Sequence, residues 1–178
     1  MKRIIKLVSV TLILATVVLS TSSCGLLAAG LFDTILNGDT SSNEEALSTE
    51  AEFYKLVGET KLLLDEVSNN VALYWYESLY ENKHGGDAED AIDKAMAENE
   101  EKIALIHEND TRIIELYRTM VDDYSDMEYA AADVMGSYNA YFSSVLEVGG
   151  KTYEFYSSST QNCMLTLSVS LRNYYVEL

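Results

Sequence analysis

The 178-residue sequence contains no proline, and over two long stretches a seam of mostly apolar residues recurs at alternating steps of four and three. From 43 to 81 the seam consists of Phe53, Val57, Thr60, Leu64, Val67, Val71, Tyr74 and Ser78. From 88 to 124 it consists of Ile92, Met96, Asn99, Ile103, Ile106, Asp110, Ile113, Tyr117, Met120 and Tyr124. This spacing places each seam on one helix face, and no proline interrupts the helix. The sequence therefore predicts two long helices.

The stretch NKHGGD, residues 82–87, predicts a tight turn between these helices. We expect Gly85 and Gly86 to end the first helix and Asp87 to cap the second. Two long helices joined by so short a connection pack antiparallel. The first half of the chain after residue 43 is therefore predicted to be a helical hairpin.

A second pair of helices is predicted from 125 to 178. Ser125 and Glu128 form a capping box for the third helix, whose seam is Met127, Ala131, Val134, Tyr138, Tyr141 and Val145. The fourth helix follows two glycines at 149–150, with a seam of Tyr156, Thr160, Cys163, Leu167 and Tyr174. Leu165 to Leu171 also alternates as a strand would, but a lone strand has no partner, so a helix is favoured. The predicted fold is all-α, a long antiparallel hairpin plus two further helices, resembling a four-helix bundle.

The chain is strongly acidic, with 12 lysines and arginines against 29 aspartates and glutamates, a formal net charge of −17. Three of the basic residues and none of the acidic ones precede Cys24, so the chain from Cys24 onward carries −20. Such a polyanion repels nucleic-acid phosphates, and we expect no nucleic-acid binding. The charge is expected to keep helix faces solvated, with a basic partner or loosely held divalent cations as the alternative.

The first 24 residues place positive charge before an apolar segment and a cysteine after it. The positive residues are Lys2, Arg3 and Lys6, the apolar segment runs from Leu7 to Leu19, and small polar residues at 20–23 lead to Cys24. This arrangement resembles the type II signal peptide of bacterial lipoproteins, which is cut before a cysteine that becomes diacylated. The sequence departs from the family pattern at Thr21, where leucine, valine or isoleucine is usual.

The resemblance covers residues 1–24 and implies a signal peptide at 1–23 and a lipid-anchored tether at 24–42, while the heptad spacing predicts a single helical domain at 43–178. That domain comprises the hairpin 43–124 and the second helix pair 125–178. The implied location is the cell envelope, held by lipid on Cys24. In a Gram-negative organism, Gly25 in place of aspartate after the cysteine implies the outer membrane, facing the periplasm. An ordinary secretory signal and an uncleaved helical anchor over residues 4–32 remain alternatives.

Motifs for metal binding and catalysis find little support in the sequence. Ferritin-type di-iron bundles need two Glu-x-x-His pairs, and only Glu81 with His84 fits. The acidic stretch 122–128 lacks the EF-hand spacing, and no nucleophile motif, phosphate-binding loop or dinucleotide fingerprint occurs. We therefore expect no metal, no cofactor and no enzymatic activity. Cys163 has no intramolecular disulfide partner if Cys24 is lipidated, and it is expected to be a small buried apolar residue.

Three polar residues of the second helix are candidate ligand-binding residues. Asn99 and Asp110 interrupt its seam, and His107 is adjacent. Polar residues at seam positions often fix helix register. The alternative is that Asn99, His107 and Asp110 line a polar cavity.

Aromatic residues near the hairpin turn are candidate partner-binding residues. Tyr74, Trp75, Tyr76 and Tyr80 occupy several faces of the first helix, with His84 in the turn. Either the third and fourth helices cover the second face, or these residues form an exposed patch that binds a partner.

The leading hypothesis is a non-catalytic envelope lipoprotein whose acidic helical bundle binds a protein or another envelope component. The alternative is a helical bundle that binds a small ligand or ion as a sensor or carrier. A passive spacer is a third hypothesis that no sequence feature excludes.

Overall fold

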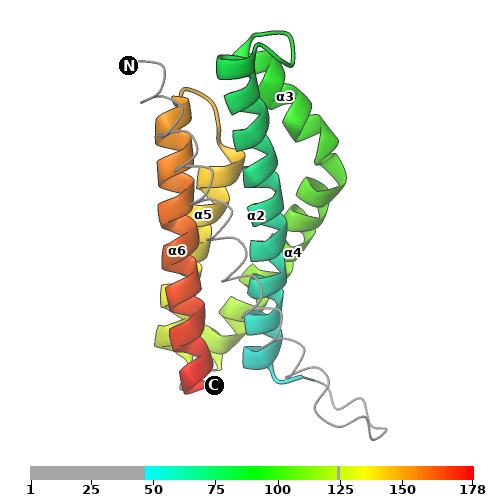
Figure 1. Ribbon diagram of the computed structural model, residues 1–178. Coiled ribbons are helices and arrows are strands. Elements are labelled where there is room, and N and C mark those ends of the chain that lie inside the picture. Colours follow the sequence, from blue (N-terminus) through cyan, green and yellow to red (C-terminus); the bar gives the residue numbers. More distant parts are fainter. Residues whose placement is uncertain (1–46, 124) are drawn as a thin grey trace, which may run out of the picture. The chain divides into compact units, whose positions relative to one another are not determined.

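Five α-helices make up most of residues 47–123 and 125–178, the part of the chain that the computed structural model describes (Figure 1). They are α2 (Thr49–Glu81), α3 (Ala88–Glu98), α4 (Glu100–Asp122), α5 (Glu128–Leu146) and α6 (Tyr153–Glu177). These two ranges contain no β-strand, so the all-α prediction is confirmed. The predicted signal peptide, Cys24 and the tether at 24–42 lie outside the described residues.

α2 lies between two other parts of the helical unit (Figure 1). On one side α3 and α4 follow each other back along α2, and we call these two helices the arm. On the other side α5 and α6 pack antiparallel to each other, and we call them the pair. The predicted hairpin and two further helices are therefore present, arranged as a four-helix bundle whose second member is broken into α3 and α4.

The core is built largely from the predicted seam residues. The buried seam residues of α2, α4 and α5, together with Met127 just before α5, are Phe53, Val57, Thr60, Leu64, Val67, Val71, Ser78, Ile106, Ile113, Met120, Met127, Ala131, Val134, Tyr138, Tyr141 and Val145. The seam prediction was wrong for Tyr74, because Trp75 is buried in its place and Tyr74 is only half-buried. In α3 the buried residues are the small Ala91 and Ala95, while the predicted Ile92 and Met96 are half-buried.

The helix boundaries differ from the prediction at the starts of α2 and α5. α2 begins at Thr49 and not at 43, because the Ser48 hydroxyl caps the helix by accepting from Ala51 N (3.2 Å). The predicted capping box at Ser125 does not form as expected. Its hydroxyl accepts from Met127 N (3.2 Å) and donates to the Glu50 carboxylate (2.9 Å), which ties the start of α5 to α2.

The second predicted helix, 88–124, is broken at Asn99, so the prediction of one continuous helix was wrong. The Asn99 side-chain amide donates to Ala95 O (2.7 Å), the carbonyl that would accept the Asn99 N–H in a continuous helix. The Asn99 N–H bonds to Met96 O instead (3.1 Å). Asparagine side chains compete with helical backbone bonds in this way, and α3 therefore ends at Glu98 while α4 starts at Glu100.

α2 ends at Glu81 because Asn82 adopts the left-handed conformation (φ 54°). The predicted end near 81 is therefore confirmed, but Asn82 rather than Gly85 takes the left-handed position that glycine usually has. Gly86 is required for a different reason, since a Cβ there would lie 2.6 Å from the Asn82 side-chain oxygen. Asp87 caps α3 as predicted, accepting from Glu89 N (2.8 Å).

The alternating stretch 165–171 is helical, as favoured. Leu167 and Leu171 are buried one turn apart, while Leu165 and Val169 are exposed on the other side of α6. Residues four apart share a helix face, so the alternation reflects a helix with apolar residues on two opposite sides. Cys163 is half-buried rather than buried, a free thiol packed against the core.

Tyrosine hydroxyls lie in the interior between α2 and the pair. Tyr141 donates to Asp65 (2.6 Å), and Lys61 donates to the other oxygen of the same carboxylate (2.7 Å). The hydroxyls of Tyr138 and Tyr156 are buried and have no hydrogen-bond partner among the described residues. Burial raises the pKa of all three tyrosines, because the phenolate form would be poorly solvated.

Candidate binding surface at the hairpin end

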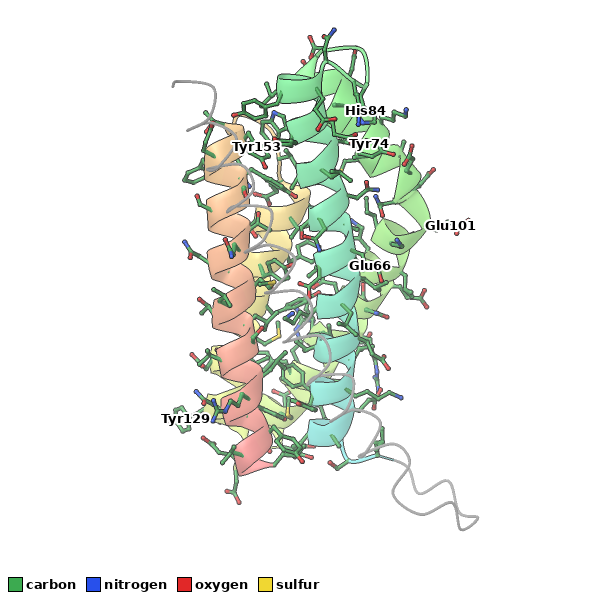
Figure 2. The ribbon with its side chains drawn as sticks, viewed as in Figure 1. Glu66, Tyr74, His84, Glu101, Tyr129 and Tyr153 are labelled. Carbon is green, nitrogen blue, oxygen red and sulfur yellow. The ribbon has the colours of Figure 1, made fainter. Side chains whose placement is uncertain are left out.

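The aromatic residues of α2 lie at the end of the bundle where α2 meets its turn and α6 begins. Figure 2 shows Tyr153, the first residue of α6, at the same end as Tyr74 and His84. These residues divide between two sides of α2. Tyr74 faces the turn and α3, whereas Trp75 and Tyr76 contact α6.

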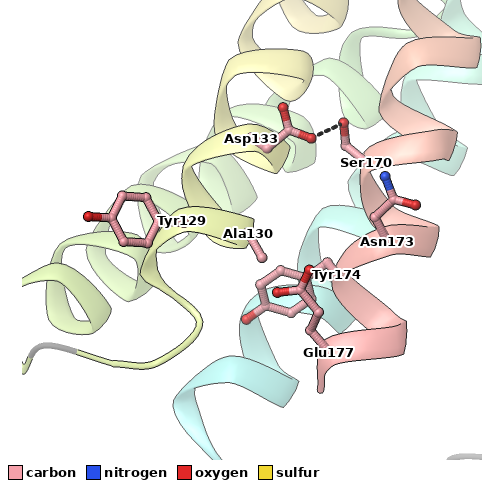
Figure 3. A pocket seen from close by; sticks show the side chains of 7 residues that line it. All are labelled: Tyr129, Ala130, Asp133, Ser170, Asn173, Tyr174 and Glu177. Carbon is pink, nitrogen blue, oxygen red and sulfur yellow. Dashed lines mark hydrogen bonds between the residues drawn. The ribbon is translucent and has the colours of Figure 1, made fainter.

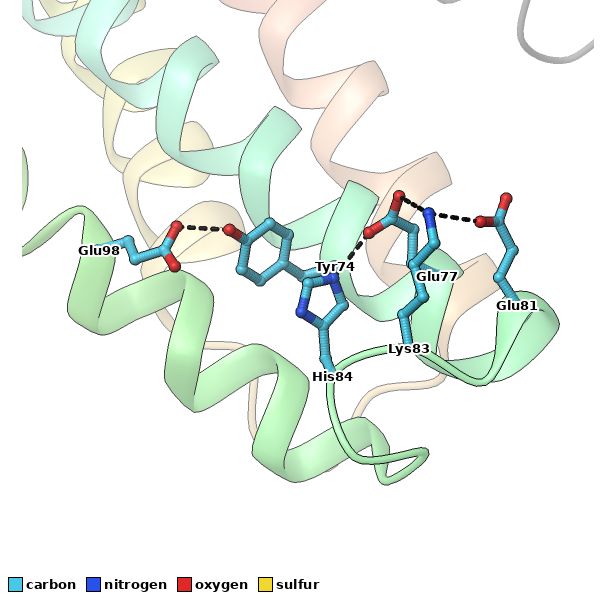
Figure 4. Close-up of polar contacts among 6 residues, drawn as sticks. All are labelled: Tyr74, Glu77, Glu81, Lys83, His84 and Glu98. Atoms are coloured by element: carbon cyan, nitrogen blue, oxygen red, sulfur yellow. Dashed lines mark hydrogen bonds and ion pairs between the residues drawn. The ribbon is translucent and has the colours of Figure 1, made fainter.

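On the side facing the arm, Tyr74 and His84 form a stacked pair. Their ring centroids are 4.1 Å apart and the ring planes differ by 16°. The Tyr74 hydroxyl donates to Glu98 of α3, and His84 Nε2 lies 2.7 Å from a Glu77 carboxylate oxygen (Figure 4). The stack therefore connects α2, the turn and α3.

Lys83 completes a charged cluster beside this stack. Its ammonium group lies 2.8 Å from Glu77 and 2.7 Å from Glu81 (Figure 4). Hydrogen bonds, first from Lys83 and then from His84, lower the pKa of Glu77. Hydrogen bonds to the Glu77 and Glu81 carboxylates raise the pKa of Lys83. The hydrogen bond to Glu98 raises the pKa of Tyr74. All these contacts hold the turn in one conformation.

His84 has a left-handed backbone (φ 56°), which is uncommon outside glycine and asparagine. The stack on Tyr74 and the contact with Glu77 offset the cost of this conformation. The structure therefore gives His84 a structural role in the turn, and its side chain is mostly covered (13% exposed). The predicted partner-binding candidates Tyr74 and His84 lie together, but they bind each other.

Trp75 is buried (5% exposed) and is removed from the candidate surface. Its ring packs against Tyr153 edge-on, with centroids 6.0 Å apart, and against Tyr156 at 5.7 Å. Of the two alternatives for the second face of α2, coverage by another helix is therefore the correct one at Trp75. The physical reason is that α6 begins at the level of the turn and lies over this face.

Three tyrosines remain at the surface on the α6 side, and we call them the aromatic cluster: Tyr76, Tyr80 and Tyr153. Their ring centroids lie 4.8 Å (Tyr76–Tyr80), 6.1 Å (Tyr76–Tyr153) and 6.4 Å (Tyr80–Tyr153) apart. Tyr80 is 59% exposed and the other two are half-buried. Partial burial and then the neighbouring Tyr80 raise the pKa of Tyr153. The cluster joins the end of α2 to the start of α6.

Tyr153 was missed as a site residue by reasoning from the sequence. Its contacts follow from the up-and-down order of the helices, which brings the start of α6 beside the end of α2. The sequence carried a usable signal, because KTYEFY at 151–156 is aromatic and follows the predicted break at 149–150. Two aromatic stretches at the same end of an antiparallel bundle are expected to meet.

The three candidate ligand residues of the arm make separate contacts. Asn99 is buried and bonded to its own helix. His107 is exposed, with its ring edge-on to Phe142 at 5.5 Å. Asp110 is half-buried near the Tyr138 hydroxyl. Burial is the main cause that raises the pKa of Tyr138, and the negative charge of Asp110 is the second cause. This contact falls outside hydrogen-bond geometry, so we treat it as electrostatic.

An open pocket of ≈ 260 Å³ lies between α5 and α6, near the C-terminal end of α6 (Figure 3). Its polar lining includes Asp133, Ser170 and Asn173. Ser170 donates to Asp133 (2.9 Å) and shares a hydrogen bond with Ser137 (2.9 Å), so these groups tie α5 to α6. No residue predicted as a site residue lines this pocket.

Within residues 47–123 and 125–178, the histidines, cysteine and carboxylates form no group of three that could hold a metal ion. Within the same ranges, no helix combines the length and the apolar composition needed to cross a membrane. Comparisons of the chain with protein-family models, with curated proteins and with solved structures found no match.

Proposed function

We propose that this protein is a cell-envelope lipoprotein, anchored through acyl chains on Cys24, whose helical bundle binds a protein or another envelope component without catalysis. The observation that carries the binding role is the aromatic cluster, in which Tyr80 is 59% exposed. Tyrosine combines a large apolar ring with a polar hydroxyl, and such residues are enriched where partners bind.

The position of the aromatic cluster suits presentation to a partner. The N-terminal segment joins the bundle at Thr49, and the cluster lies at the other end of α2. A helix of 33 residues spans about 50 Å. Most of the length of α2 therefore lies between Thr49, where the chain enters the helix, and the aromatic cluster.

Charge supports a partner that is neutral or basic at its contact surface. Glu154 follows Tyr153 and places a carboxylate beside the cluster, whereas Glu81, which follows Tyr80, is already paired with Lys83 (2.7 Å). Anionic surfaces are repelled by such a site, whereas lysine and arginine side chains are attracted to both tyrosine rings and carboxylates.

The test of binding is capture of a partner in intact cells by crosslinking, with the captured protein identified by mass spectrometry. Tyr76→Ala with Tyr80→Ala should reduce capture about ten-fold or more, while the helical circular dichroism stays unchanged. Leu105→Ala with Tyr129→Ala is the matched control, because Leu105 is exposed on α4 and Tyr129 is exposed at the opposite end of the bundle (Figure 2). Equal capture by the tyrosine variant and the wild type would contradict the proposed surface, and recovery of lipid or glycan alone would contradict a protein partner.

The lipid anchor is tested separately with Cys24→Ala and membrane fractionation. The proposal expects the precursor to stay unprocessed by the lipoprotein pathway and the labelled acyl chains to be absent. A variant that is cut normally and released would instead indicate an ordinary secretory signal. Full-length, unlabelled protein in both wild type and variant membranes would indicate an uncleaved anchor.

The alternative function, a ligand-binding bundle, retains support at one of its three residues. Asp110 lies near the buried Tyr138 hydroxyl, which has no hydrogen-bond partner among the described residues. Asn99 and His107 have other contacts, so a shared polar site with Asp110 has no geometric support. A passive spacer would show no captured partner at all.

A further inference from the structure

Charge is distributed unevenly between the arm and the pair. Residues 87–123, which contain the arm, include 12 acidic and 4 basic residues. By contrast, no charged residue occurs at 134–146 in α5 or at 155–171 in α6. The uncharged stretches belong to helices with exposed outer sides, so a surface free of charge lies on an otherwise acidic molecule.

The exposed side of α6 carries a second seam with heptad spacing, which we call the outer seam. It consists of Phe155, Ser158, Asn162, Leu165, Val169, Arg172 and Val176, at alternating steps of three and four. All seven are exposed, Val176 to 78% and Val169 to 58%. The outer seam faces away from the buried Tyr156, Leu167 and Tyr174, so α6 has one apolar face in the core and another in solvent.

We propose that a second copy of this chain covers the outer seam, with the two α6 helices packed in parallel about a two-fold axis. A heptad seam is the surface that another helix with the same spacing fits. In parallel two-stranded packing, β-branched residues at one seam position and leucine at the other favour a dimer. Val169 and Val176 occupy the first position together with Phe155 and Asn162, and Leu165 occupies the second together with Ser158 and Arg172.

Asn162 supports the same direction and register. It occupies the same heptad position as Val169, seven residues earlier. A single asparagine at this position of a parallel pair bonds to its own copy and fixes the register, at some cost in stability. A two-fold axis parallel to α6 brings the two Asn162 side chains together.

Charge and area favour a second copy over other occupants. Two chains of net charge −17 repel each other on approach, and this repulsion is weakest over residues 155–171 of α6, where both surfaces lack charge; Arg172 is the one charged member of the outer seam. α6 has 25 residues and is about 37 Å long. α5 has 19 residues and is about 28 Å long, so the outer sides of the two helices, each about 10 Å wide, give roughly 650 Å² per copy, within the range of specific interfaces.

The first experiment is disulfide trapping in the full chain on its own membrane, with Cys163→Ser to remove the native thiol. Leu165→Cys and Val176→Cys should each form a disulfide-linked dimer under mild oxidation, because parallel packing brings every seam position to its own copy. Leu105→Cys, an exposed position on α4, is the matched control and should stay monomeric. Trapping at Leu165 alone would overturn the parallel direction, and equal trapping at Leu105 or an adduct with a different protein would overturn the second copy.

The second experiment measures the mass of the purified full chain in detergent by native mass spectrometry. Leu165→Glu with Val169→Glu should lower the dimer fraction about ten-fold or more, because each copy then places two carboxylates in the seam. Leu73→Glu with Leu105→Glu adds the same charge at exposed positions elsewhere and should leave the dimer intact. A monomeric wild type, or a dimer that survives the seam change with unaltered helicity, would overturn the proposal.

The dimer is independent of the proposed partner surface. Tyr76→Ala with Tyr80→Ala should abolish partner capture and leave the trapped dimer at Leu165 unchanged. Loss of the dimer in this variant, with helicity intact, would contradict the outer seam as its interface.

Discussion

The arm and the pair both pack on α2, but different interactions hold them there. The pair buries large tyrosines, among them Tyr138 and Tyr174, and its hydroxyl groups bond to α2. The arm buries aliphatic residues of α4, such as Ile106 and Ile113, but only small residues of α3, and it adds ion pairs at the surface such as Lys102–Glu66 (2.8 Å). Apolar burial stabilises far more than exposed ion pairs do. We therefore expect α4 to hold the arm on α2, whereas the attachment of the pair depends on buried tyrosines.

Raising the pH should destabilise the pair more than the arm, and this is the largest effect that we expect. Burial raises the pKa of Tyr138, Tyr141, Tyr156 and Tyr174, all in the pair, above the ordinary value of 10.0. The unfolded chain then releases these protons first, so the stability they provide is present below pH 10 and is lost as the pH rises above it. Each such group costs about 1.4 kcal/mol per pH unit, and four together cost roughly 6 kcal/mol at pH 11.

Circular dichroism and phenolate absorbance, followed together from pH 8 to 11.5, check this expectation. Part of the phenolate signal should appear only as the helical signal is lost. Tyr156→Phe removes one of the four groups and should make the alkaline loss of stability less steep. Complete tyrosine ionisation with the helices intact would show that these four hydroxyls are accessible to solvent.

Trp75→Ala should have the next largest effect. Trp75 is 5% exposed and packs between Tyr153 and Tyr156, so truncation leaves a cavity between α2 and the pair. Such substitutions cost about 3 to 5 kcal/mol. Urea unfolding measures the loss, and Tyr80→Ala, an exposed neighbour one turn further, is the control. A loss as small as that of the control would mean that α6 does not cover this face.

Two conservative substitutions in the pair should differ in sign. Tyr141→Phe removes a hydrogen bond to the Asp65 carboxylate and should cost about 1.5 to 2 kcal/mol. Tyr156→Phe removes a buried hydroxyl that has no partner among the described residues, and it should be neutral or stabilise by up to about 1 kcal/mol. Thermal unfolding at pH 7 measures both. A destabilising Tyr156→Phe would indicate that this hydroxyl bonds to a buried water molecule.

Arg112→Ala in the arm should have the smallest effect. The guanidinium binds Glu52 of α2 through Nε (3.0 Å) and Nη2 (2.9 Å), but both side chains are well exposed. We expect a slight decrease in Tm at low salt that disappears near 1 M salt, where charges are screened within about 3 Å. A large decrease that persists at high salt would mean that the arm depends on this ion pair.

The heptad seams predicted the helices of the bundle, because burial of one face determines the spacing of apolar residues. They did not predict the break at Asn99, since the seam continues through it and the cause is a single side-chain hydrogen bond to Ala95 O. Placing Tyr74 rather than Trp75 in the core was a shift of one residue. The seam could not resolve that shift, because α6 approaches α2 from a different direction than the arm does.

The candidate surface was predicted in part. Tyr76 and Tyr80 are half-buried and exposed, as one of the two alternatives had it, whereas His84 is held by Tyr74 and Glu77. That contact depends on the left-handed backbone at His84, which no periodicity reveals. The heptad spacing of the outer seam of α6 is present in the sequence. The spacing alone does not show which of the two apolar faces of α6 is buried, because that depends on where the neighbouring helices pack.

The break at Asn99 sets how the hairpin end opens to solvent. α3 has 11 residues and buries only Ala91 and Ala95, and a helix of that length is marginal by itself. Its amides should therefore exchange with deuterium through local opening, long before those of α4 and α6, which open with the whole bundle. Because Glu98 of α3 accepts a hydrogen bond from the Tyr74 hydroxyl, each such opening also removes the contact between α3 and the Tyr74–His84 stack. The least protected segment of the bundle thus adjoins the aromatic end.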